Sequence, residues 1–192
     1  MDPLSEALSL VKAALEQVGI RYAVGGSVAS STRGIARATV DVDLVAAIHP
    51  AQTEALAKAL GADWYADPAM IRSALQAGRS FNVIHIRTAQ KVDIFPAMTD
   101  FDDAQLERAT VVPLGAERIP CPVATAEDIL LAKLQWYRDG GEVSDRQWYD
   151  ITGIVETNPA LDMPYLESWA ARLGVGRLLA KALADAEREP RR

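Results

Sequence analysis

The sequence predicts a mixed α/β domain followed by an all-helical domain, and two features of the chain carry this prediction. Short apolar runs that alternate with polar residues and are bounded by glycine or proline indicate strands in roughly the first two thirds of the chain. After Pro122, apolar residues recur only at helical spacing. We therefore expect a mixed sheet flanked by helices over residues 1–122 and a C-terminal helical bundle over residues 123–192.

In the first domain, the expected elements alternate between helices and strands. Leu4, Leu8, Val11 and Leu15 are spaced as one face of an N-terminal helix over residues 4–18. The elements expected after it are a strand over 21–24, a short helix over 27–32, a strand over 40–48, helices over 50–60 and 69–77, strands over 80–87 and 91–95, and a weaker strand over 117–121. Residues 88–90 predict a hairpin between two of these strands.

In the second domain, helix caps mark the expected boundaries. Thr125 and Asp128 form a capping-box pattern at the start of a helix that ends near Gly140. Ser144 or Asp145 caps the next helix, which runs to about residue 157. Two further helices are expected over residues 163–173 and 176–187.

The composition favours a globular protein of the cytoplasm. The chain of 192 residues is 49% apolar and 24% charged, a balance that can build a core. It has no apolar run of the roughly 20 residues that span a bilayer, and its N-terminus has no basic cluster of a secretory signal. The single cysteine, Cys121, fits a reducing compartment, so we expect a cytoplasmic protein without a membrane partner.

Two aspartates lie near the start of the strand expected over residues 40–48. Side chains two residues apart in a strand point to the same face, so Asp41 and Asp43 project together while Val42 and Leu44 face a core. Two close carboxylates repel each other, and a divalent cation between them removes the repulsion.

A third aspartate follows the same logic in the strand over residues 91–95. Asp93 lies between Val92 and Ile94, so it faces away from the apolar side of its strand. Together with Asp41 and Asp43 it forms an oxygen-rich ligand set, which predicts Mg²⁺ or Mn²⁺ as the metal. One thiol and two histidines cannot form a structural zinc site.

A glycine turn precedes the carboxylates. Gly25, Gly26 and Ser27 come after an expected strand and before an expected helix. Glycines at this position allow the backbone to approach a phosphate closely, and the helix N-terminus and the Ser27 hydroxyl supply donors. A tight turn that needs glycine for its geometry alone is the simpler interpretation of Gly-Gly taken by itself.

In order along the chain, these motifs resemble those of the nucleotidyltransferase superfamily related to DNA polymerase β. The matching residues are Gly25, Gly26, Ser27, Arg37, Thr39, Asp41, Asp43 and Asp93. The resemblance covers residues 5–96 and implies the nucleotidyltransferase-type sheet and a nucleoside triphosphate (NTP) substrate. It implies that Asp41 and Asp43 hold metal ions and the triphosphate, that Asp93 completes the cage and helps to activate the attacking hydroxyl, and that Arg37 and Thr39 belong to the NTP-binding set.

The helical half is similar to that of AbiEii-type and MenT-type nucleotidyltransferases, which are toxins of bacterial toxin–antitoxin systems. This similarity rests on residues 125–134 and 145–151 and implies a catalytic role for Lys133, a role in NTP binding for Asp150 and a cognate antitoxin as a partner. Lys133 also lies on the apolar face of its expected helix. There its ammonium either reaches water, or contacts a phosphate or Asp150.

The function predicted from the sequence is metal-dependent transfer of a nucleoside monophosphate from an NTP to a hydroxyl of RNA, such as a tRNA end, or of a protein. The alternative acceptor is a small molecule, as in aminoglycoside and lincosamide resistance enzymes. The net charge of −6 favours this alternative, because broad binding of nucleic acid needs a basic surface. A degenerate antitoxin or binding module stays open, although all three aspartates are present.

Overall fold

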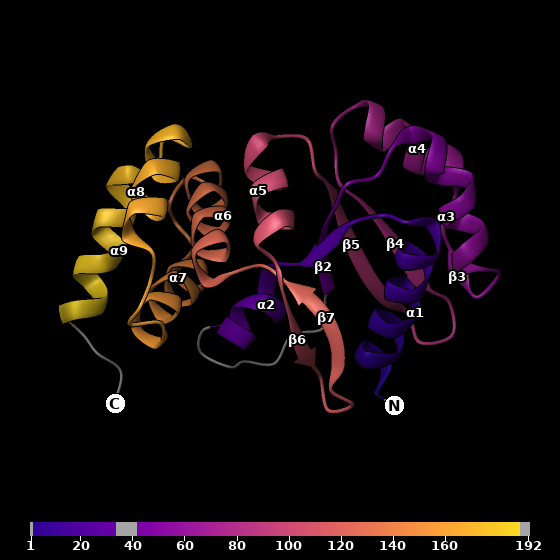
Figure 1. Cartoon of the computed structure of the whole chain (residues 1–192), viewed down its shortest axis with the longest axis horizontal. Coiled ribbons are helices and arrows are strands. Elements are labelled where there is room, and N and C mark those ends of the chain that lie inside the picture. The colour runs from indigo at the N-terminus through magenta and orange to yellow at the C-terminus, as the bar shows by residue number, and fades with distance from the viewer. Residues whose placement is uncertain (1, 34–41, 189–192) are drawn as a thin grey trace. The chain divides into compact units, whose positions relative to one another are not determined.

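The computed structural model describes residues 2–33 and 42–188. Its elements are α1 (Pro3–Val18), β1 (Tyr22–Val24), α2 (Gly26–Arg33), β2 (Val42–Ala46), the 3₁₀ helix η1 (Pro50–Gln52), α3 (Thr53–Leu60), β3 (Trp64–Tyr65), α4 (Pro68–Gln76), β4 (Phe81–His85), β5 (Gln90–Pro96), α5 (Asp100–Arg108), β6 (Thr110–Leu114), β7 (Ile119–Val123), α6 (Ala126–Asp139), α7 (Asp145–Thr157), α8 (Met163–Arg172) and α9 (Gly176–Arg188) (Figure 1).

The described residues divide into two compact units. The first contains residues 2–28 and 42–124, and the second contains residues 29–33 and 125–188. Helix α2 begins in the first unit, and its last residues belong to the second.

A single mixed sheet organises the first unit. Its seven strands have the order β3-β4-β5-β2-β1-β7-β6. The pairs β2–β5 and β1–β7 are parallel, whereas the other neighbouring strands are antiparallel. The fold is therefore the mixed sheet flanked by helices that the sequence predicts.

Strand burial follows the expected alternation where the sheet is central. In β2, Val42 and Leu44 are fully buried, and Asp43 between them is partly exposed. Helix α1 begins where the Asp2 carboxylate accepts hydrogen bonds from two backbone N–H groups, and it contacts α3, β5 and β7. Helix α1 buries Leu8, Val11 and Leu15 in this unit, and burial of such apolar side chains stabilises it.

Three elements of the first unit are absent from the sequence prediction. They are β3, α5 and β6. The predicted strand over residues 117–121 also begins too early, because Glu117 and Arg118 belong to the turn that joins β6 to β7. Arg118 has a φ of 53° and donates its backbone N–H to the Gly115 carbonyl, a geometry that a strand does not have.

The second unit contains the four helices α6 to α9. Helix α7 packs against α6 and α9, and α8 packs against the same two helices. Their apolar faces meet in a core that includes Leu130, Leu134, Ile151, Ile154 and Leu166. Among the residues that the structure describes, no helix combines the length and the apolar character needed to cross a membrane.

Candidate active site

Two aspartates from different parts of the chain are aligned in the sheet. Asp43 of β2 and Asp93 of β5 are direct partners in the register of these parallel strands. The neighbours Val42, Leu44, Val92 and Ile94 are fully buried, so both carboxylates emerge on the opposite face of the sheet. Adjacent strands are about 4.8 Å apart, which brings the two carboxylates close enough to share one ligand.

The glycine turn between β1 and α2 lies directly beside Asp43. The backbone N–H of Gly25 donates to the Asp43 carbonyl oxygen at 2.9 Å, and that of Ser27 donates to the Asp43 carboxylate oxygen Oδ2 at 3.3 Å. Gly26 has a φ of 54°, and a Cβ atom at that position would lie 1.8 Å from Asp43 Oδ2. The turn therefore needs glycine for two reasons, its left-handed backbone and its contact with the carboxylate.

Ser27 also places the positive end of the α2 helix dipole beside the site. Its N–H is among the first backbone donors of α2, where the helix dipole favours a negative group. The hydrogen bond to Asp43 uses this end of the helix to stabilise a carboxylate. Thus the structure brings together Gly25, Gly26, Ser27, Asp43 and Asp93, five of the residues that the sequence predicts for the site.

Two further polar residues flank Asp93. Asn82 of β4 is the direct partner of Asp93 across the β4–β5 hairpin and shares its face of the sheet. Lys91, two residues before Asp93, places its Nζ atom 2.7 Å from Asp93 Oδ2. Neither residue is part of the sequence prediction, although the expected hairpin turn at residues 88–90 fixes the register that pairs Asn82 with Asp93.

Three predicted site residues lie outside the described part of the chain. They are Arg37, Thr39 and Asp41. Within residues 2–33 and 42–188, no group of three or more His, Cys, Asp or Glu side chains is arranged to hold a metal ion. The predicted ligand set is represented there by Asp43 and Asp93.

Lys133 and Asp150 form a buried ion pair in the helical unit. Lys133 of α6 places Nζ 2.9 Å from Asp150 Oδ2 of α7, and the two side chains are only 7% and 6% exposed. The ammonium therefore does not reach bulk water, which leaves contact with Asp150 as the arrangement observed. The predicted contacts of these residues with a nucleotide stay predictions.

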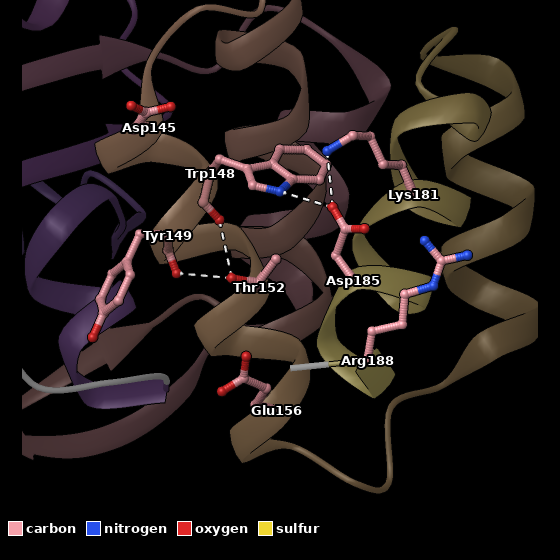
Figure 2. A pocket seen from close by; sticks show the side chains of 8 residues that line it. All are labelled: Asp145, Trp148, Tyr149, Thr152, Glu156, Lys181, Asp185 and Arg188. Atoms are coloured by element: carbon pink, nitrogen blue, oxygen red, sulfur yellow. Dashed lines mark hydrogen bonds and ion pairs between the residues drawn. The ribbon is translucent and has the colours of Figure 1, made fainter. Parts of the chain in front are cut away.

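A pocket of about 530 Å³ lies between α7 and α9 of the helical unit. In Figure 2, Trp148, Lys181 and Asp185 point toward one another at its wall. The Trp148 indole donates to Asp185 Oδ2 at 3.2 Å, and the Lys181 ammonium lies 3.7 Å from the ring centroid of Trp148 and 2.8 Å from Asp185 Oδ2. The two contacts of Trp148, with Asp185 and with Lys181, join α7 to α9, so Trp148 serves interhelix packing.

Comparison with solved structures identifies the fold. The chain is similar to the crystal structure of ANT(2″)-Ia in complex with adenylyl-2″-tobramycin, with a TM-score of 0.50 and 16% identity over 88% of this chain and 95% of that chain. It is similar also to an antigenic nucleotidyltransferase-like protein from Paracoccidioides brasiliensis, with a TM-score of 0.50 and 22% identity over 92% of this chain and 91% of that chain. No protein-family model matches the chain, and no curated sequence matches it significantly.

The chain therefore has a nucleotidyltransferase-like fold, as the sequence predicts. At these identities the likeness concerns the fold, so the site residues stand on the geometry of the sheet and the glycine turn. The narrower similarity to AbiEii-type and MenT-type enzymes remains a prediction.

Proposed function

We propose that this protein is a metal-dependent nucleotidyltransferase that moves a nucleoside monophosphate from an NTP to a hydroxyl group of an acceptor. The observation that carries the proposal is the register of Asp43 and Asp93 on neighbouring parallel strands, directly beside the glycine turn. Carboxylates can hold the divalent cation of a metal-bound triphosphate, and the N-terminus of a helix can bind its phosphates.

The residues at this position fit a hard divalent cation. Asp43 and Asp93 supply oxygen ligands from two rigid strands, and Asp41 is the third ligand expected from the sequence. When bound, Mg²⁺ or Mn²⁺ supplies charge neutralisation for the triphosphate. The Ser27 N–H supports this role because it orients the Asp43 carboxylate through a hydrogen bond.

The transfer step itself involves the acceptor hydroxyl, the NTP and the Asp93 carboxylate. The acceptor oxygen forms a bond to the α-phosphorus of the NTP while the bond from that phosphorus to the pyrophosphate oxygen breaks. The proton of the acceptor hydroxyl passes to the carboxylate of Asp93, and pyrophosphate leaves. In this proposal the glycine turn lets the phosphates approach its backbone closely. Glycine at position 26 also keeps the Asp43 carboxylate in place, because a side chain there would displace it.

For the acceptor we propose RNA or a protein, in a toxin–antitoxin setting. The support is the similarity of the helical half to AbiEii-type and MenT-type enzymes, which rests on the segments that contain Lys133 and Asp150. A small-molecule acceptor is the second candidate. It is favoured by the net charge of −6 and by the likeness to ANT(2″)-Ia, whose crystal structure contains adenylyl-2″-tobramycin.

The test incubates the protein with Mg²⁺ or Mn²⁺ and each of the four α-labelled NTPs, in separate reactions with tRNA, protein and aminoglycoside acceptors. We expect label in one acceptor class and pyrophosphate release. Asp43→Ala abolishes transfer and leaves the melting temperature nearly unchanged, because repulsion between the carboxylates is relieved as the Ser27 hydrogen bond is lost. Asp63→Ala, at an exposed loop position of the same unit, is the matched control and keeps full activity.

Two results contradict the proposal. One is the absence of both transfer and binding with every triphosphate. The other is transfer by Asp43→Ala at the wild-type rate. A large loss of stability in Asp43→Ala indicates instead that the carboxylate has a structural role.

A further inference from the structure

Lys91 and Asp93 form an ion pair on the face of the sheet that carries the proposed site. They are two residues apart in β5, so both side chains emerge on the same face. The Nζ–Oδ2 distance is 2.7 Å, and the Lys91 and Asp93 side chains are 39% and 22% exposed. Asp93 is therefore the more enclosed member of the pair.

This pair differs from two other lysine ion pairs in the described part of the chain. The pairs Lys12–Glu16 and Lys181–Asp185 join residues four apart on a helix, a common arrangement that contributes little to stability. The carboxylate that pairs with Lys91, in contrast, is that of Asp93, which is aligned with Asp43 on the neighbouring strand.

The alignment of two carboxylates creates an electrostatic requirement. Like charges on directly opposed strand positions destabilise a sheet. A positive group in contact with one of the carboxylates offsets that repulsion. The ammonium of Lys91 has this position relative to Asp93.

We propose that Lys91 is a built-in counterion of the site, which a divalent cation displaces from Asp93 and which then contacts the phosphates of the bound nucleotide. The inference rests on the proposed function, since it assigns a binding role to a residue beside its carboxylates. The ammonium and a cation would bind the same carboxylate of Asp93, and their positive charges repel each other, so their binding is competitive. Lysine has a flexible four-carbon stem, so the released ammonium can turn toward an anion at the same face without any movement of the backbone.

Two binding constants change in opposite directions if this is so. Removal of the lysine charge relieves competition and strengthens binding of the cation alone. The same change removes a phosphate contact and weakens binding of the anion to the cation-loaded protein. A residue that only supports the fold would shift both constants in the same direction or shift neither, so the opposed signs are specific to the proposal.

The experiment measures Mn²⁺ binding by electron paramagnetic resonance without nucleotide, and then binding of inorganic pyrophosphate at saturating Mn²⁺ by calorimetry. Pyrophosphate is the probe because it does not depend on which base the enzyme prefers. For Lys91→Met we expect about two- to fivefold tighter Mn²⁺ binding and about two- to fivefold weaker pyrophosphate binding, as for a partly exposed charge pair. Lys91→Arg keeps the charge and stays close to wild type.

Lys58→Met is the matched control, because Lys58 is an exposed lysine of α3 in the same unit and its loss changes the net charge equally. Lys91→Gln replaces Lys91→Met if the latter fails to fold by circular dichroism. The inference is overturned if the neutral Lys91 variant matches Lys58→Met in both constants while wild type binds Mn²⁺. Absence of Mn²⁺ binding in wild type, by contrast, contradicts the proposed function itself.

Discussion

Gly26 lies so close to Asp43 that a Cβ atom on Gly26 would be 1.8 Å from the carboxylate oxygen Oδ2. Its neighbour in the turn, Gly25, has space for a side chain, since a Cβ atom there meets no described atom within 4 Å. Of these two adjacent positions in one turn, position 26 therefore needs glycine and position 25 has room for a side chain. Substitution of Gly26 therefore tests how much the placement of the Asp43 carboxylate contributes to transfer, while Asp43 itself is kept.

Gly26→Ala is expected to displace the Asp43 carboxylate and to strain the backbone. A left-handed residue other than glycine costs about 1–2 kcal/mol, and the contact with Oδ2 adds to this cost. Transfer should fall by at least about tenfold, because a small misplacement of a reacting group has large effects on rate. Urea unfolding and label incorporation measure the two effects. Gly25→Ala is the control for stability, because a Cβ there meets no described atom within 4 Å, and an equal loss of stability in both variants would show that the contact with Asp43 is unimportant.

The strands that carry the candidate site are predictable from the sequence because their patterns are local. Val42, Asp43 and Leu44 alternate, and so do Val92, Asp93 and Ile94, so each strand reveals which of its residues faces the core. The register between β2 and β5 is not predictable in this way. These strands are joined by other elements of the sheet and its helices, and their pairing depends on long-range packing rather than on a turn.

The missed elements lack strong local signals for other reasons. Strand β3 has only two residues, and β6 is an edge strand that contains Pro113, a residue that argues against a strand when the chain is viewed alone. Helix α5 buries only Phe101 and Gln105, so it has almost no apolar stripe. The partnership of Lys133 with Asp150 joins two helices and was one of several arrangements that the sequence allowed.

Asn82 lies directly opposite Asp93, so a charge at this position should make stability depend on divalent cations. Like charges directly opposite each other in a sheet destabilise it by roughly 0.2–1 kcal/mol, so Asn82→Asp should lower the free energy of unfolding by about that amount in EDTA. Addition of Mg²⁺ should restore it, because a bound cation removes the repulsion. Thermal unfolding with and without Mg²⁺ provides the measurement. Asn82→Ala adds no charge and should show no greater Mg²⁺ dependence than wild type. If the Mg²⁺ dependence of Asn82→Asp also stays at the wild-type level, the cation does not bind beside Asn82 and Asp93.

Stability should decrease at alkaline pH because of two buried groups in neighbouring strands. Burial raises the pKa of the Cys121 thiol to about 11 and also raises the pKa of the Tyr22 hydroxyl. The folded state keeps a thiol proton that the unfolded chain releases above its ordinary pKa of about 8.5. The stabilisation is therefore complete below about pH 8.5 and is lost as the pH rises toward 11.

Urea midpoints measured at intervals across this pH range test the expectation. The Cys121→Ala variant should show a smaller decrease between about pH 8.5 and 10, the range in which tyrosine contributes little. Its lower absolute stability does not affect the comparison, because the slope against pH is what is measured. An identical slope in both proteins would mean that the thiol does not contribute.

Lys133 and Asp150 offer a way to separate stability from catalysis in one pair of residues. Lys133→Met leaves the Asp150 carboxylate buried without its lysine, and loss of one member of a buried pair costs about 3–5 kcal/mol. The double variant Lys133→Met, Asp150→Leu replaces both charges with apolar groups and should recover most of that loss. Urea unfolding of Lys133→Met, of the single variant Asp150→Leu and of the double variant gives the coupling free energy. The double variant, with its stability recovered, then reports on catalysis. If the pair also acts on the nucleotide, this variant has no transfer activity. Activity close to that of wild type would limit the pair to a structural role.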